Sequence, residues 1–139
     1  MRWIFAVCLG LLVACSPSPA RAPEPASVRV AGGAYKNVAP AGLKQMLAAK
    51  DFFFVNAHIP YEGEIAPTDA FVEYDRIAEN IGKLPADPNA KIFLYCRSGR
   101  MSALAAEALI QRGYTNIWNL DGGMVAWESA GLPLIQKVR

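Results

Sequence analysis

The chain has 139 residues, 53% of them hydrophobic, and a formal net charge of +2 at neutral pH. This length suits one domain, and the charges form no basic cluster of the kind that binds nucleic acid. The three cysteines, Cys8, Cys15 and Cys96, make no CxxC pair and no Cys/His cluster, which argues against a structural zinc site. We therefore expect one domain with no nucleic-acid partner, no metal and no cofactor.

The first residues are predicted to be an export signal. Arg2 precedes an apolar run over residues 3–14, which is shorter than the roughly 20 apolar residues of a membrane-spanning helix and fits a secretory signal. The run ends Leu12-Val13-Ala14-Cys15, which resembles the cleavage motif of bacterial lipoproteins. An ordinary signal peptide with a chance cysteine, or an uncleaved anchor, is the alternative.

In the lipoprotein interpretation residues 1–14 are the signal peptide and Cys15 is the lipidated first residue of the mature protein. The protein then resides in the bacterial cell envelope, attached to a membrane through the lipid and facing the periplasm. Ser16 after the cysteine favours the outer membrane over the inner one. Prolines recur in the next residues and favour extended chain, so we expect a tether over residues 15–32 and the folded domain over residues 33–139.

Helical and extended patterns alternate along the rest of the chain. Apolar runs or short apolar segments predict strands at residues 35–38, 52–55, 70–73, 91–95 and 116–120. Apolar residues three and four apart predict helices at residues 40–50, 74–81, 101–113 and 124–129. This alternation is typical of an α/β domain with a mostly parallel sheet. In such sheets ligands bind beyond the carboxyl ends of the strands.

One stretch carries the chemistry: Cys96 follows the strand predicted at 91–95 and precedes the helix predicted at 101–113. A loop entering a helix presents backbone N–H groups and the positive end of the helix dipole, which together favour an anion. They would stabilise a thiolate at Cys96, and the sequence therefore predicts a nucleophilic cysteine. The alternative is a small buried core residue, since cysteine often has that role.

The remaining residues of this loop are candidate substrate contacts. Gly99 lets the backbone close around the anion, or only marks the turn. Arg97 and Arg100 either bind an anionic substrate or face solvent. Ser98 and Ser102 are able to donate to a bound sulfur, and Ser102 alternatively caps the helix or lies on its surface.

The loop Cys96-Arg97-x-Gly99-x-x-Ser102-Ala103 resembles the active-site loop of rhodanese-type sulfurtransferases, and residues 120–127 and 130–133 resemble the closing helix of that family. The resemblance implies a five-stranded, mostly parallel sheet with helices on both sides. It also implies transfer of sulfane sulfur from a donor to Cys96, as a persulfide, and on to cyanide, a thiol or a protein cysteine.

The sequence departs from that family at three places. Many members have Asp-x-Arg where residues 56–58 read Asn56-Ala57-His58, and Gly-His-Ile where Glu64 stands between Gly63 and Ile65. Members that use thiosulfate often have Arg or Thr at the position of Met101. Met101 therefore favours a less polar or a protein-borne donor.

Two other functions compete with sulfur transfer. A phosphatase or arsenate reductase of the Cys-x5-Arg type needs an arginine at position 102, where this chain has Ser102. A lipid-anchored binding or persulfide-carrier module with little turnover of its own would explain the altered residues Asn56, His58 and Glu64.

Overall fold

The computed structural model describes residues 21–137. The predicted signal peptide, the predicted lipidation site Cys15 and the beginning of the predicted tether lie outside these residues. Within the described part of the chain, no helix has both the length and the apolar character needed to cross a bilayer.

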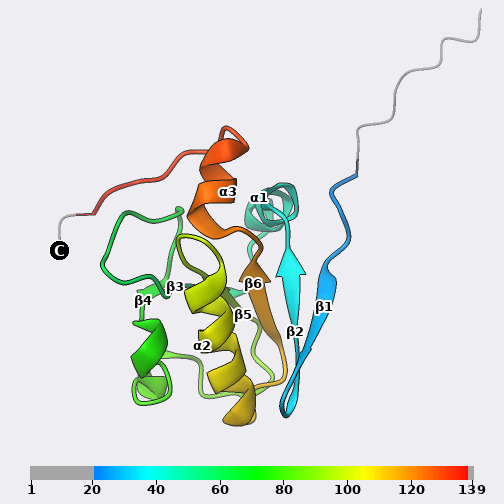
Figure 1. Ribbon diagram of the computed structural model, residues 1–139, viewed down its shortest axis with the longest axis vertical. Helices are drawn as coiled ribbons and strands as arrows, with labels where there is room; N and C mark the ends of the chain where they lie inside the picture. The colour runs from blue at the N-terminus through cyan, green and yellow to red at the C-terminus, as the bar shows by residue number, and fades with distance from the viewer. Residues whose placement is uncertain (1–20, 138–139) are drawn as a thin grey trace, which may run out of the picture.

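The domain is built on a six-stranded sheet with the strand order β1-β2-β6-β5-β3-β4 (Figure 1). The strands are β1 (Ala26–Val30), β2 (Gly33–Val38), β3 (Phe53–Asn56), β4 (Ala70–Phe71), β5 (Ile92–Tyr95) and β6 (Ile117–Leu120). All neighbouring strands run parallel except β1, which is antiparallel to β2. The α/β fold with a mostly parallel sheet is therefore confirmed.

The edge strand β1 corrects two expectations, because it raises the strand number from five to six and occupies residues expected to be tether. Its side chains alternate: Val28 and Val30 pack against the core, while Ser27 and Arg29 are exposed. This alternation is typical of a strand with one covered face. Residues 26–30 thus belong to the folded domain.

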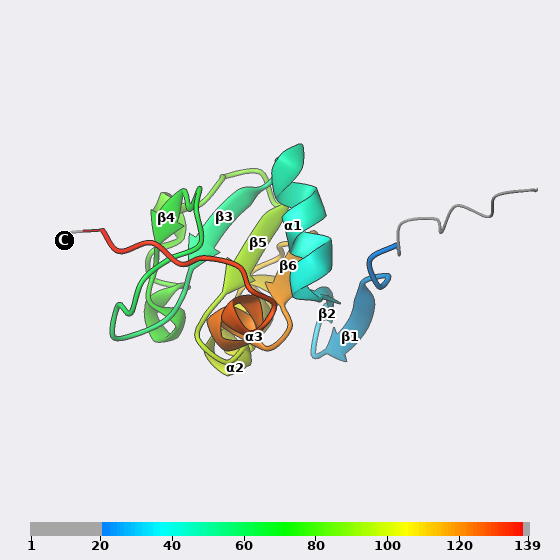
Figure 2. The same ribbon diagram turned by 90° about the horizontal axis from the view of Figure 1, so that it is seen from above.

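Three helices, α1 (Pro40–Ala48), α2 (Arg100–Gln111) and α3 (Gly123–Ser129), complete the domain. Helices α1 and α2 cover opposite faces of the sheet (Figure 2), as expected. Helix α3 lies beyond the carboxyl ends of the central strands (Figure 1), and its Met124 and Trp127 join the core on the α1 side.

The single helix predicted at residues 74–81 is wrong. Two short 3-10 turns stand there, η1 (Tyr74–Arg76) and η2 (Ile81–Lys83), on the α2 side of the sheet. The backbone N–H and the side-chain amide of Asn80 both donate to the Arg76 carbonyl, each at 3.0 Å. Asn80 itself leaves the helical region, with a φ of −100° and a ψ of 25°, so this turn does not continue as a helix.

The central strand β5 shows why its sequence is apolar throughout. Phe93 and Tyr95 pack on the α1 side, whereas Ile92 and Leu94 pack on the α2 side, and all four are buried. A strand covered on both faces needs no polar alternation. Because Cys96 directly follows Tyr95, the core fixes the place at which the candidate loop begins.

Candidate active site

The thiol of Cys96 lies buried at the carboxyl end of β5 and in front of helix α2. The Gly99 backbone N–H donates a hydrogen bond to its sulfur, with an N–Sγ distance of 3.0 Å. The Ser102 hydroxyl has two acceptors within reach of its one proton, the sulfur at 3.4 Å and the Gly99 carbonyl oxygen at 3.2 Å. Donors directed at a sulfur stabilise its anionic form more than its neutral form. The arrangement therefore favours a thiolate, or the terminal anion of a persulfide, inside this loop.

The loop closes around the sulfur because residue 99 is glycine. Gly99 has a φ of +91° and is the N-cap residue of α2. A Cβ atom here would lie 3.2 Å from the Gly122 nitrogen and 3.3 Å from the Leu120 carbonyl oxygen. The left-handed conformation and this close approach together favour glycine, so the role in closing the loop that the sequence suggested is consistent with the geometry.

The beginning of helix α3 holds the other side of the loop. The Met124 N–H donates to the Cys96 carbonyl at 2.8 Å, and the Val125 N–H donates to the Arg97 carbonyl at 3.0 Å. Because a trans peptide unit points its C=O and N–H in opposite directions, the N–H groups of Arg97 and Ser98 point away from α3. Helix α3 thus orients the peptide units that follow the nucleophile.

The other predicted loop residues take different positions. Ser102 is buried against the sulfur, Met101 is half-buried, and Ser98 and Arg100 are exposed. The side chain of Arg97 is 48% exposed, and its Nη1 lies 3.5 Å from Oε2 of Glu62. The loop therefore places Ser102 at the sulfur and both arginines at the outer surface.

Glu62 is the residue that the sequence did not single out. Its Oε2, which faces Arg97, also lies 2.8 Å from Nε2 of His58, and His58 is buried. The two loops meet because β3 and β5 are paired with Asn56 opposite Tyr95, and the Ala57 N–H donates to the Tyr95 carbonyl at 2.8 Å. A sequence pattern does not reveal this contact, because strand register produces it.

The departure at Asn56 has a structural role. Its side-chain amide donates to the Gly63 carbonyl at 2.9 Å, and its Oδ1 accepts from the His58 N–H at 3.0 Å. The buried Asn56 therefore ties together the two ends of the loop that carries Glu62.

The buried Glu64 joins this loop to the C-terminal segment. Its Oε1 lies 2.6 Å from Nζ of Lys137, and its Oε2 accepts from the Tyr61 hydroxyl at 3.1 Å. The backbone of Glu64 exchanges two hydrogen bonds with Ile135. Figure 2 shows the C-terminal segment crossing this part of the molecule. The segment thus acts as a strap over the loop.

Tyr95 anchors the end of β5 immediately before the nucleophile. Its hydroxyl accepts from the Ile65 N–H at 3.0 Å and lies 2.7 Å from Oγ1 of Thr68. Burial raises the pKa of the Tyr95 hydroxyl, and the hydrogen bonds with Thr68 and Ile65 oppose this rise only in part. The neutral phenol is therefore a fixed structural link between β5 and the loop before β4.

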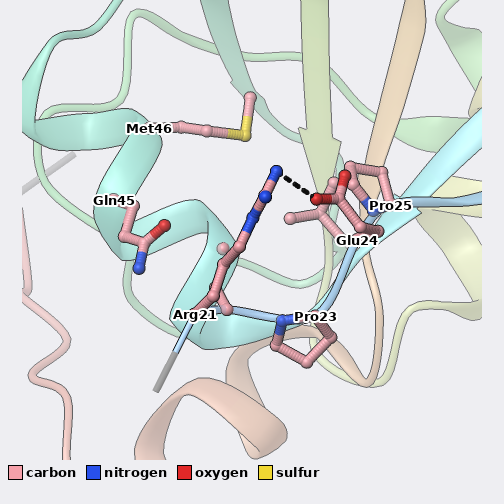
Figure 3. A pocket seen from close by; sticks show the side chains of 9 residues that line it. Arg21, Pro23, Glu24, Pro25, Gln45 and Met46 are labelled. Carbon is pink, nitrogen blue, oxygen red and sulfur yellow. Dashed lines mark ion pairs between the residues drawn. The ribbon is translucent and has the colours of Figure 1, made fainter. Parts of the chain in front are cut away.

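A separate hollow of about 320 Å³ lies between residues 21–25 and helix α1 (Figure 3). Val38, Gln45 and Met46 line it, and Arg21 and Glu24 form an exposed ion pair at its edge. None of residues 96–102 lines this hollow. It holds no nucleophile, so the chemistry is assigned to the Cys96 loop.

Comparison with known proteins agrees with this geometry. Residues 44–130 match the rhodanese-like domain family. A sulfurtransferase of Allochromatium vinosum is 33% identical over 96 residues, which cover 67% of this chain and 88% of that protein. The tRNA uridine(34) hydroxylase of Yersinia pestis is 27% identical over 104 residues, which cover 66% of this chain but 29% of that protein.

Among solved structures, a rhodanese-related protein from Thermoplasma volcanium superimposes with a TM-score of 0.63 at 27% identity, over 74% of this chain and 100% of that one. The residues that match the family, 44–130, contain β5, the Cys96 loop and α2. The chain therefore belongs to the rhodanese-like domain family.

Proposed function

We propose that this protein is a sulfurtransferase that carries sulfane sulfur as a persulfide on Cys96. The observation that supports this proposal is the hydrogen bond from the Gly99 N–H to the cysteine sulfur, with the Ser102 hydroxyl as a second group within donating distance of that sulfur. Those donors stabilise a negative sulfur, which is the state needed both for attack and for holding the transferred atom. Membership of a family that includes a sulfurtransferase supports the same chemistry.

The reaction has two steps. The Cys96 thiolate attacks the outer sulfur of the donor, a Cys96 S–S bond forms, and the donor leaves with the electron pair of its broken bond. A thiolate or cyanide then attacks the terminal sulfur of the persulfide, and the electron pair of the broken S–S bond returns to Cys96. Each step is a displacement at sulfur, and no external oxidant or reductant is required.

The loop residues have separate roles in this proposal. Gly99 and Ser102 stabilise the charge on sulfur, and the exposed Arg100 attracts an anionic donor at the outer surface. Arg97, which is also exposed, forms an ion pair with Glu62. Met101 contributes neither a charge nor a hydroxyl, which favours a less polar or protein-borne donor over thiosulfate.

Mass spectrometry of the purified protein tests the proposal. After exposure to thiosulfate or to a polysulfide, the wild type should gain one sulfur atom on the peptide that contains Cys96, and a subsequent thiol or cyanide should remove it. The Cys96→Ser variant should gain no sulfur on that peptide. Absence of any sulfur adduct with every donor would refute sulfur transfer.

A persulfide carrier with little turnover of its own is the second candidate. The altered residues Asn56, His58 and Glu64 favour it, because the loop that carries them contacts Arg97 beside the nucleophile through Glu62. The two candidates differ in the second step: a sulfurtransferase delivers sulfur to cyanide repeatedly, whereas a carrier keeps its persulfide until a protein thiol is supplied.

We also propose that the domain is anchored to a membrane of the bacterial envelope through a lipid on Cys15, facing the periplasm. The motif over residues 12–15 and the apolar run before it support this proposal. The Cys15→Ala variant should move from the membrane fraction to the soluble fraction. Unchanged membrane association of that variant would contradict lipidation at this position.

A further inference from the structure

The ion pair between Glu62 and Arg97 places a negative charge beside the nucleophile loop. Oε2 of Glu62 lies 3.5 Å from Nη1 of Arg97, and Arg97 directly follows Cys96 in the chain. The pair is partly exposed, since the side chains of Arg97 and Glu62 are 48% and 41% accessible. The positive charge of the residue that follows the nucleophile is therefore offset by a carboxylate.

The contact with His58 fixes the position of that carboxylate. Nδ1 of His58 is buried and has no hydrogen-bond partner within residues 21–137. In the neutral ring the single proton therefore belongs on Nε2, because a buried N–H without an acceptor costs more than a bare ring nitrogen. Nε2 then donates to Oε2 of Glu62 across 2.8 Å and orients the carboxylate.

The backbone around Glu62 is also held in place. Asn56 links both ends of the loop, and the side-chain amide of Gln136 donates to the Glu62 carbonyl at 3.3 Å. The neighbouring Glu64 pairs with Ile135 of the C-terminal strap through two backbone hydrogen bonds. A carboxylate fixed in this way acts on incoming ligands through its electrostatic field, as a preorganised charge.

We propose that Glu62 is a specificity-determining residue that selects sulfur donors by charge, disfavouring small dianionic donors in favour of donors with fewer negative charges. This inference rests on the sulfur transfer proposed above. The carboxylate repels a doubly charged donor about twice as strongly, in free energy, as a singly charged one, because Coulomb energy is proportional to charge. The apolar Met101, in the first turn of α2 after the nucleophile loop, adds no compensating positive charge.

Two donors that differ by one charge make the test direct. Thiosulfate carries two negative charges, and methanethiosulfonate carries one, with a methyl group in place of one oxygen. Both deliver their outer sulfur by the same displacement and release sulfite or methanesulfinate. The rate of persulfide formation on Cys96 is measured by mass spectrometry over a range of donor concentrations, with the full-length protein.

At low ionic strength Glu62→Gln should raise the second-order rate constant for thiosulfate about fivefold and that for methanethiosulfonate about twofold. The gain should come from tighter donor binding rather than from a faster maximal rate. Salt should reduce the difference between the donors, because mobile ions screen a partly exposed charge. A purely structural role of Glu62 would instead change both donors by one factor, independent of salt.

The matched control is Asp51→Asn. Asp51 also forms an ion pair at the surface, with Lys91 at 2.9 Å, but it lies at the amino ends of the parallel strands β3 and β5, whereas Cys96 lies at the carboxyl end of β5. This variant also removes one negative charge. It should leave unchanged the ratio of the second-order rate constants for thiosulfate and methanethiosulfonate.

If the ratio of the rate constants for the two donors stayed the same in Glu62→Gln, or changed equally in Asp51→Asn, the role of Glu62 would be overturned while sulfur transfer stayed intact. No persulfide on Cys96 from either donor, in wild type and variants alike, would instead overturn the sulfur transfer on which the inference rests.

Discussion

Replacing Gly123 by alanine should distort the nucleophile loop, although Gly123 lies outside that loop. Gly123 begins helix α3 with a φ of +59°. A Cβ atom there would lie 2.6 Å from both the carbonyl carbon and the carbonyl oxygen of Arg97. Real Cβ atoms do not approach backbone so closely, so α3 and the loop must separate.

The cost of this substitution has two parts. Alanine in the left-handed conformation costs about 1–2 kcal/mol. Separation also weakens the bonds from Met124 and Val125 to the carbonyls of Cys96 and Arg97, each of which contributes about 1 kcal/mol. We therefore expect Gly123→Ala to lower the free energy of unfolding by about 3–4 kcal/mol.

Gly113→Ala is the control for the backbone part. Gly113 has a φ of +93°, and a Cβ atom there would meet nothing within 4 Å. This variant should lower the free energy of unfolding only by the conformational cost of about 1–2 kcal/mol. It should form the Cys96 persulfide at the wild-type rate.

The assay combines urea unfolding with the rate of persulfide formation on Cys96. A displacement of about 1 Å between reacting groups slows a reaction by as much as about 100-fold, so we expect Gly123→Ala to load sulfur about 10- to 100-fold more slowly. If Gly123→Ala matched Gly113→Ala in both stability and loading rate, the contact between α3 and the loop would have no functional weight.

Three further changes probe the site and its support. Ser102→Ala removes one donor to the Cys96 sulfur and should slow persulfide formation about three- to tenfold, measured by mass spectrometry, since a net hydrogen bond is worth about 1 kcal/mol. Burial raises the pKa of the Tyr95 hydroxyl, so the folded state holds this proton more tightly than the unfolded chain does. The stability that this provides is complete below the usual tyrosine pKa of about 10 and is lost as pH rises above that value. Above it, the free energy of unfolding should fall by as much as about 1.4 kcal/mol per pH unit. Lys137→Met removes the cation paired with the buried Glu64 and should destabilise the domain by about 1–3 kcal/mol in urea unfolding, because a buried charge loses a partner.

Each of these predictions has its own check. Ser102→Thr keeps a hydroxyl and should form the persulfide faster than Ser102→Ala. Equal rates in the two variants would show that the hydroxyl does not assist persulfide formation. Tyr95→Phe should flatten the alkaline slope, and an unaltered slope would assign it to other groups. Adding Glu64→Gln to Lys137→Met should recover part of the lost stability, and a further loss would contradict the ion pair.

Local residue patterns were sufficient to predict the elements around the site. The apolar run of β5, the turn at Gly99 and the helical spacing of α2 placed Cys96 at the carboxyl end of a strand and in front of a helix. These features are adjacent in the chain, and short-range periodicity reports them directly. By contrast, the recurring prolines predict a tether up to residue 32, whereas residues 26–30 form β1 by pairing with β2.

The α/β alternation and the cysteine at a strand–helix junction follow from local residue patterns, because backbone geometry and burial on both faces of the sheet dictate those patterns. The groups that surround that cysteine come from the packing of distant segments. Pairing of Asn56 with Tyr95 brings Glu62 to Arg97, and α3 orients the carbonyls of the loop. Contacts between residues distant in the chain depend on strand register and helix docking, which no local spacing specifies.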